Sequence, residues 1–341
     1  MIKKLLAVGA LVALASCSGG VNPFNPDTGG DNGGGNGGGD DGTPITRDGL
    51  PPGTASPTPS STIFRKEARD ANGNGYAENI AYDGTTDTFL VDNLAFDGVT
   101  SGQSVYARGT AVSSLGPFAV YESATVADDV FNGQPINQFA YRAIYGVSNS
   151  GNTQFAIVRT GSYVNYGFGG FIYQRDTGVT LPTTGQGSYT GQYAGLRDFD
   201  GVGGLEYTQG DAAVQVDFED FNDGQGVTAQ ITNRRIFDIA GNDVTQDVIS
   251  AWNTANPTNT IGALPVIRFR IGDGVADANG ELAGEAFSNI GGEGFEAGNF
   301  YAMMAGPNAE EITGVVVVTS TDPRFPSTPT VRETGGFIVY R

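Results

Sequence analysis

The stretch GQGSYTGQY, residues 185–193, alternates between two kinds of side chain. Tyr189 and Tyr193 fall on one face of an extended chain, and Ser188 and Gln192 fall on the other. A period of two with one apolar and one polar face predicts a β-strand that covers a packed interior. This stretch therefore indicates a sheet protein.

The same alternation recurs through the second half of the chain. Eight candidate strands lie near 186–194, 212–218, 226–233, 265–271, 281–289, 293–304, 311–319 and 334–340. Eight strands can close into a barrel that side chains fill, which also removes exposed sheet edges. Large residues at inward positions, including Phe218, Phe269 and Phe337, favour a filled interior.

The first half predicts about seven further strands, including 137–147, 153–161 and 163–175. One helix is expected over 243–254, inside the longest barrel connection. We therefore predict an all-β protein with an N-terminal antiparallel sheet, residues 62–180, which we call the handle. It precedes an eight-stranded antiparallel β-barrel, residues 181–341.

The N-terminus has the pattern of a lipoprotein signal. Two lysines precede the apolar run from Leu5 to Ala15, which is too short to cross a bilayer as a helix. Leu14-Ala15-Ser16-Cys17 resembles the lipobox of bacterial lipoproteins, in which the cysteine is acylated. We expect a signal peptide at 1–16, lipidation of Cys17 and, because Ser18 follows, sorting to the Gram-negative outer membrane, with surface exposure. Acyl chains would attach the protein to the membrane without a spanning segment.

Residues 17–61 are rich in Gly, Asn, Asp and Pro. Such a composition buries too little apolar surface to offset its ordering entropy, so this segment predicts a disordered tether. As a coil it would have an end-to-end distance of roughly 35 Å. The folded body is therefore expected to stand away from the membrane.

Composition excludes several chemistries. The 341 residues contain no His and one Cys, which rules out a His-based triad, a His-ligated zinc and an internal disulfide. The formal charge of −19 opposes binding to nucleic acid. No ordered catalytic pair stands out, so we predict a non-enzymatic protein. We also expect a monomer.

Several segments, in order, resemble the transferrin-binding protein B family of surface lipoproteins. They are Gly170-Phe-Ile-Tyr-Gln174, Leu181-Pro182, the stretch 185–193, Val216-Asp217-Phe218, Gly306-Pro-Asn-Ala-Glu-Glu-Ile-Thr-Gly314 and Gly335-Gly336-Phe337. The resemblance implies a single handle-plus-barrel lobe and a binding role towards a protein or an iron-linked ligand. The transferrin receptors of that family carry two such lobes, whereas this chain has room for one.

Aromatic residues supply the candidate partner-binding site. Trp252 lies on the predicted helix, and Tyr163, Tyr166 and Tyr173 lie in a Gly-interrupted aromatic stretch. Exposed aromatic residues are typical of interfaces. The alternative is that the aromatic stretch forms the core of the handle sheet.

Asp70, Asn72 and Asn74 alternate as in a calcium loop, and Glu78 supplies a further carboxylate. They form a candidate calcium site, and the alternative is an Asn-Gly turn before a strand. No other cofactor is expected.

Other functions remain as alternatives. Asp176-Thr-Gly178 has the form of the aspartic protease triplet, but Gln174 and Arg175 precede it, which favours a turn. A small-ligand carrier that faces the periplasm is a second alternative. A carboxylate-dependent envelope hydrolase is a third, because Asp217, Glu219, Asp220, Asp223 and Glu310-Glu311 cluster.

Overall fold

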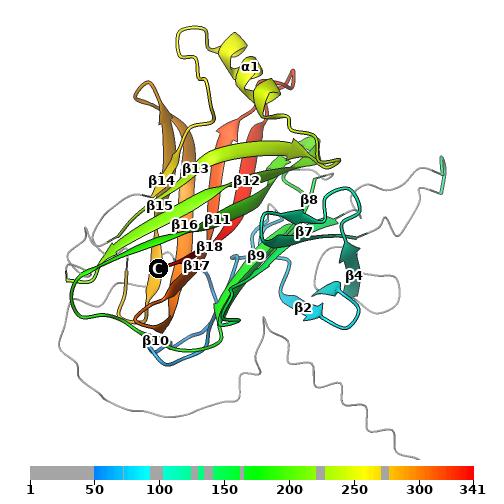
Figure 1. Ribbon diagram of the computed structural model, residues 1–341. Helices are drawn as coiled ribbons and strands as arrows, with labels where there is room; N and C mark the ends of the chain where they lie inside the picture. Colours follow the sequence, from blue (N-terminus) through cyan, green and yellow to red (C-terminus); the bar gives the residue numbers. More distant parts are fainter. Residues whose placement is uncertain are drawn as a thin grey trace, which may run out of the picture.

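The computed structural model describes residues 50–71, 73–92, 103–123, 130–133, 141–161, 165–219, 227–269 and 276–341. It divides into a curled sheet and a barrel (Figure 1). The signal peptide, Cys17 and most of the predicted tether lie outside the described residues. Within the described part, no helix is both long and apolar enough to cross a membrane.

The first sheet is the predicted handle. Its strands are β1 (Ile63–Lys66), β2 (Asn79–Asp83), β3 (Thr88–Asp92), β4 (Gln103–Arg108), β5 (Ser114–Leu115), β6 (Phe118–Glu122), β7 (Tyr141–Val147), β8 (Thr153–Thr160) and β9 (Gly169–Arg175). They pair antiparallel in the order β1-β9-β8-β7-β6-β4-β3-β2, and β5 pairs with β6. Strand β9, the last strand of this sheet along the chain, pairs with β1. Strand β1 forms one edge of the sheet.

The second sheet is the predicted barrel. Its strands are β11 (Gln186–Phe199), β12 (Val202–Asp217), β13 (Val227–Asp238), β14 (Ile267–Phe269), β15 (Glu281–Ile290), β16 (Glu293–Pro307), β17 (Glu311–Thr321) and β18 (Thr330–Tyr340). Each pairs antiparallel with its neighbours, and the β16–β17 ladder closes the ring. The short β10 (Val179–Thr180) pairs in parallel with β16. The prediction of eight barrel strands is confirmed.

Side chains fill the barrel as expected. Tyr189, Tyr193, Phe218, Phe269 and Phe337 all belong to one buried cluster inside it. The ring of Phe269 stacks on that of Phe300 with centroids 4.2 Å apart. The interior is a packed core, since aromatic side chains of this size occupy the space that a ligand would need.

The handle packs against the outside of the barrel. Val316 and Val318 point into the barrel core, whereas Val315 and Val317 contact handle residues in a second cluster. That cluster joins handle residues such as Phe171 to barrel residues such as Tyr301, whose rings stack at 6.0 Å. Strand β17 is apolar on both faces because the barrel core covers one face and the handle covers the other.

Buried charges tie the two parts together. Arg65 on β1 donates to both carboxylate oxygens of Glu281 on β15, at 2.6 and 2.8 Å. Arg175 on β9 donates to the carbonyls of Asn279 and Met304 in the barrel, at 2.7 and 2.8 Å. Burial lowers the pKa of Arg175 to about 10, still far above neutral pH. The handle and barrel are therefore fastened by charged hydrogen bonds as well as by apolar packing.

The packed body begins earlier than predicted. Lys66 N donates to Pro52 O at 2.9 Å, and Val179 N donates to Pro59 O at 2.7 Å. Arg175 also donates to carbonyls of residues 58–61. The last part of the predicted tether, residues 50–61, thus belongs to the folded body. Its backbone carbonyls accept hydrogen bonds from the handle and from Val179, and amino-acid composition does not predict such contacts.

Removing Arg65 tests this connection. Arg65→Met leaves the Glu281 carboxylate buried without its counterion, so we expect the free energy of unfolding to fall by about 3–5 kcal/mol. Chemical denaturation measures the change.

The matched control is Arg235→Ala, which breaks a more exposed ion pair with Asp243. Its cost should be about 1 kcal/mol or less. Equal effects of the two variants would show that the Arg65–Glu281 pair does not hold the parts together.

Candidate partner-binding site

One end of the barrel gathers several connections, one of which carries the predicted partner residue Trp252. We call it the upper end: the β11–β12 and β15–β16 hairpins, the connection 239–266 with α1 (Thr245–Ala255), and the β17–β18 connection. Helix α1 stands at this end of the barrel (Figure 1). The predicted helix at 243–254 is confirmed to within two residues.

Helix α1 is fixed to the barrel by a few apolar side chains. Val248 and Ile249 are buried, and the half-buried Trp252 meets Phe295 of β16 edge-to-face with centroids 4.7 Å apart. Trp252 Nε1 donates to Asn259 O at 3.2 Å. Asn253 closes the connection through two bonds to the backbone of Ile261. Trp252 is thus a rigid aromatic group that remains partly open to a partner.

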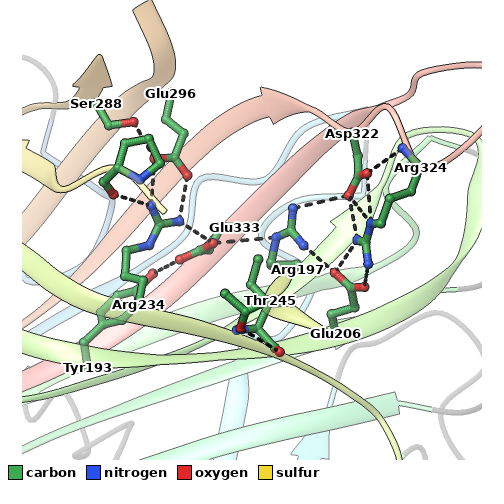
Figure 2. A network of polar contacts seen from close by, with 12 residues as sticks. Tyr193, Arg197, Glu206, Arg234, Thr245, Ser288, Glu296, Asp322, Arg324 and Glu333 are labelled. Carbon is green, nitrogen blue, oxygen red and sulfur yellow. Dashed lines mark hydrogen bonds and ion pairs between the residues drawn. The ribbon is translucent and has the colours of Figure 1, made fainter. Parts of the chain in front are cut away.

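A buried charge network supports this end from below (Figure 2). Glu333 on β18 accepts from the hydroxyl of Tyr193 and from Arg234, both at 2.8 Å. Arg234 also forms a bidentate pair with Glu296, at 2.6 and 2.8 Å, and Ser288 donates to the same carboxylate. Four barrel strands besides β18 contribute to this half of the network.

The other half reaches the β17–β18 connection (Figure 2). Arg197 pairs with Glu206 and lies 3.5 Å from Asp322 and 3.7 Å from Glu333. Arg324 pairs with Glu206 at 2.7 Å and with Asp322 at 2.6 Å. Because each guanidinium bridges two or more carboxylates from different strands, the network fixes the relative positions of the upper connections.

The network also shifts proton affinities. Burial raises the pKa of Glu333, but the charges of Arg234 and Arg197 more than offset it, and its pKa lies below the ordinary range. Burial likewise opposes ionisation of Asp322, yet its hydrogen bond from Arg324 leaves its pKa lowered. Both carboxylates are therefore ionised at neutral pH.

A cavity of about 10 Å³ separates the network from α1. Arg197, Arg234 and Glu296 line it on the barrel side, and Trp252 and Leu264 line it on the other. This is about the room that one water needs. The upper end is therefore a surface above a filled core.

The predicted tyrosines separate in the structure. Tyr166 lies at the upper end, half-buried, with the Arg332 guanidinium 4.6 Å from its ring centroid. Tyr173 is fully buried in the handle–barrel cluster and has no surface to offer a partner, as the alternative of a handle core requires. Tyr163 lies outside the described residues. The structure thus brings Trp252 and Tyr166 to the same end and excludes Tyr173.

The side chains of the candidate calcium loop are hydrogen-bonded or ion-paired to other residues. Asp70 accepts from the backbone and side-chain nitrogens of Asn74, at 3.2 and 2.7 Å. Asn74 Oδ1 accepts from Arg332, and Glu78 pairs with Lys66 at 3.4 Å. Asn72 lies outside the described residues. A calcium ion would have to replace these contacts.

Calcium binding stays a prediction, and it has a direct test. If the loop binds calcium, adding the ion to chelator-treated protein raises the melting temperature, because a ligand that binds the folded state stabilises it. Scanning calorimetry with calcium and with chelator measures the shift. Identical melting curves would contradict the site.

Asp176, which suggested protease chemistry, is hydrogen-bonded by neighbouring side chains. The Asp176 carboxylate accepts from the side-chain amides of Gln154 and Gln174, at 3.0 and 2.6 Å. Burial raises its pKa. Asp220 and Asp223 lie outside the described residues. Among the residues that the structure describes, no group of three or more acidic or thiol side chains could hold a metal ion.

The sequence did not single out the charge network. Its charged members lie within barrel strands or, for Asp322 and Arg324, in the β17–β18 connection, and an acidic sequence offers many such positions. The sequence feature that could have pointed to the network is the pair Arg234-Arg235 directly after Asn233. In the structure, Asn233 has a positive φ of 53° and lies at a break in the β12–β13 register. The irregularity turns Arg234 inward and leaves Arg235 exposed.

Comparison with known proteins gives structural similarities only. No protein family model matches the sequence, and no curated protein matches it. Transferrin-binding protein B of Haemophilus parasuis is 12% identical, with a TM-score of 0.37, over 82% of this chain and 45% of that one. The corresponding protein of Neisseria meningitidis is 12% identical, with a TM-score of 0.30, over 82% and 62%.

A third solved structure, titled as a surface lipoprotein, is 12% identical, with a TM-score of 0.28, over 57% of this chain and 79% of that one. The chain spans about half the length of the first transferrin-binding proteins that it matches. These similarities do not identify a ligand.

The network makes stability depend on pH. The folded-state pKa values of Glu333 and Asp322 lie below those of the unfolded chain, so their contribution is present above the unfolded values, about 4. It is lost as the pH falls through the folded values. We expect the free energy of unfolding to decline on acidification below about pH 4.5.

Glu333→Gln removes one of these two titrating groups, so its stability should fall less steeply with acid than that of the wild type, from a lower starting value. Denaturant titrations between about pH 3 and 7 measure both slopes. Parallel curves would mean that Glu333 does not carry the dependence.

Proposed function

We propose that the chain is a lipid-anchored, surface-exposed outer-membrane protein that binds a protein or an iron-linked ligand without catalysing a reaction. The observation that carries the proposal is the filled barrel. Because its interior is occupied, recognition has to occur at the outer surface and connections. The upper end supplies a rigid, partly open aromatic group at Trp252.

The anchor and location rest on the sequence. Cys17 follows an apolar run in a lipobox-like order, and the segment after it is poor in apolar residues. The ligand class comes from the resemblance of the strand and turn motifs to transferrin-binding protein B. We propose a monomer that does not bind nucleic acid, in keeping with the acidic composition.

The carrier alternative requires an internal cavity, and the same packing weighs against it. The stacked rings of Phe269 and Phe300 and the Glu333 network occupy the barrel interior. The hydrolase alternative requires a free pair of carboxylates at a fixed spacing. The buried carboxylates at the upper end of the barrel, Glu206, Glu296 and Glu333, are each neutralised by an arginine.

The partner site is tested with two variants in a capture experiment from the native envelope. Trp252→Ala removes the aromatic group, and Asp247→Arg reverses a charge on the exposed side of α1. Each should lower partner capture by about tenfold or more, the size of effect that central interface residues produce. Quantitative mass spectrometry of the captured proteins measures it.

The control is Tyr82→Ala, another half-buried aromatic residue, which lies on the handle strand β2. It should leave capture unchanged, and all three variants need melting temperatures near that of the wild type. If a partner is captured equally by Trp252→Ala and Tyr82→Ala, the upper end is not the site.

The anchor is tested separately. Cys17→Ser should abolish incorporation of a labelled fatty acid and release the protein from the membrane fraction. Protease treatment of intact cells should remove the folded body. Labelling that persists in Cys17→Ser, or protection of the body in intact cells, would contradict the anchor or the surface location respectively.

A further inference from the structure

A polar groove lies at the opposite end of the barrel from α1. It has a volume of about 730 Å³ and lies where the β7–β8 turn of the handle meets the barrel. The handle contributes Asn149 and Ser150, and the barrel contributes Asn308, Glu310 and Tyr340. A concave site of this volume is within the range that small ligands occupy.

Bonds between the handle and the barrel hold the groove in shape. Ser150 Oγ donates to Glu311 at 2.8 and 2.9 Å, and Asn149 N donates to the Tyr340 hydroxyl oxygen at 2.9 Å. Arg341 donates to the carbonyls of Asn308 and Gln186, at 3.0 and 3.2 Å. Since segments distant in the sequence are already joined, a ligand would meet a preorganised site.

Several polar groups of the groove are still available. The side chains of Asn149, Asn308 and Glu310 make no hydrogen bond to another residue that the structure describes. The Tyr340 hydroxyl accepts from Asn149 N and keeps its own proton to donate. Together they offer two amides that donate and accept, one carboxylate that accepts and one phenol that donates.

This combination suits sugar hydroxyls. A hydroxyl donates and accepts at once, as do the two amides, whereas a cationic peptide would use only the acceptors and would meet Arg341. The Glu311 side chain already accepts from Ser150 and Thr153, which leaves Glu310 as the free side-chain carboxylate of the groove. We propose that this groove binds a neutral oligosaccharide.

The proposal is independent of the partner site at the upper end, so either can fail without the other. The test uses the purified full-length protein with chitotetraose, maltotetraose and cellotetraose as probes, and octalysine as the cationic comparison. Saturation-transfer NMR detects binding, and titration measures affinity. We expect at least one saccharide to bind, with little dependence on salt.

The variants Asn149→Ala and Glu310→Ala remove exposed side chains and should each weaken that binding by about tenfold, with melting temperatures unchanged. The control Glu293→Ala removes an exposed carboxylate at the upper end and should bind as the wild type does. The proposal is overturned if no saccharide binds, or if the groove variants bind it as the control does. Salt-sensitive binding of octalysine alone, lost in Glu310→Ala, would instead identify a cationic partner.

Discussion

Closure of an eight-stranded sheet around a filled interior is the constraint on which the rest of this molecule depends. Eight strands enclose little more space than side chains fill, so inward residues must pack or pair with one another. Over most of the barrel they are aromatic and aliphatic. At the upper end they are charged, and the requirement that buried charges be paired produces the chain of arginines and carboxylates around Glu333.

The distribution of cations follows from the same constraint. The protein is strongly acidic, yet six of the arginines in its described part are buried: Arg65, Arg159, Arg175, Arg197, Arg234 and Arg332. Five of them neutralise interior carboxylates, and Arg175 instead binds carbonyls. Cations used in this way are not available at the surface.

Because the barrel is filled, the binding that we propose has to use the outside of the molecule. The two ends then differ in chemistry: α1 at one end carries an aromatic group above a rigid charge network, and the groove at the other end carries free amides and a carboxylate. The handle contributes to both ends, through Tyr166 near the barrel hairpins and Asn149 in the groove. Fastening the handle to the barrel is therefore a condition for either surface.

The sequence by itself determined the fold class, the eight barrel strands and the helix that carries Trp252. These follow from period-two alternation, turn residues and a short amphipathic stretch, all of which are local. Only the tertiary structure decided that Tyr173 is fully buried and Tyr166 only half-buried, that residues 50–61 pack on the body, and that Arg234 points inward. Each depends on which distant segment covers a given face, and neither spacing nor composition contains that information.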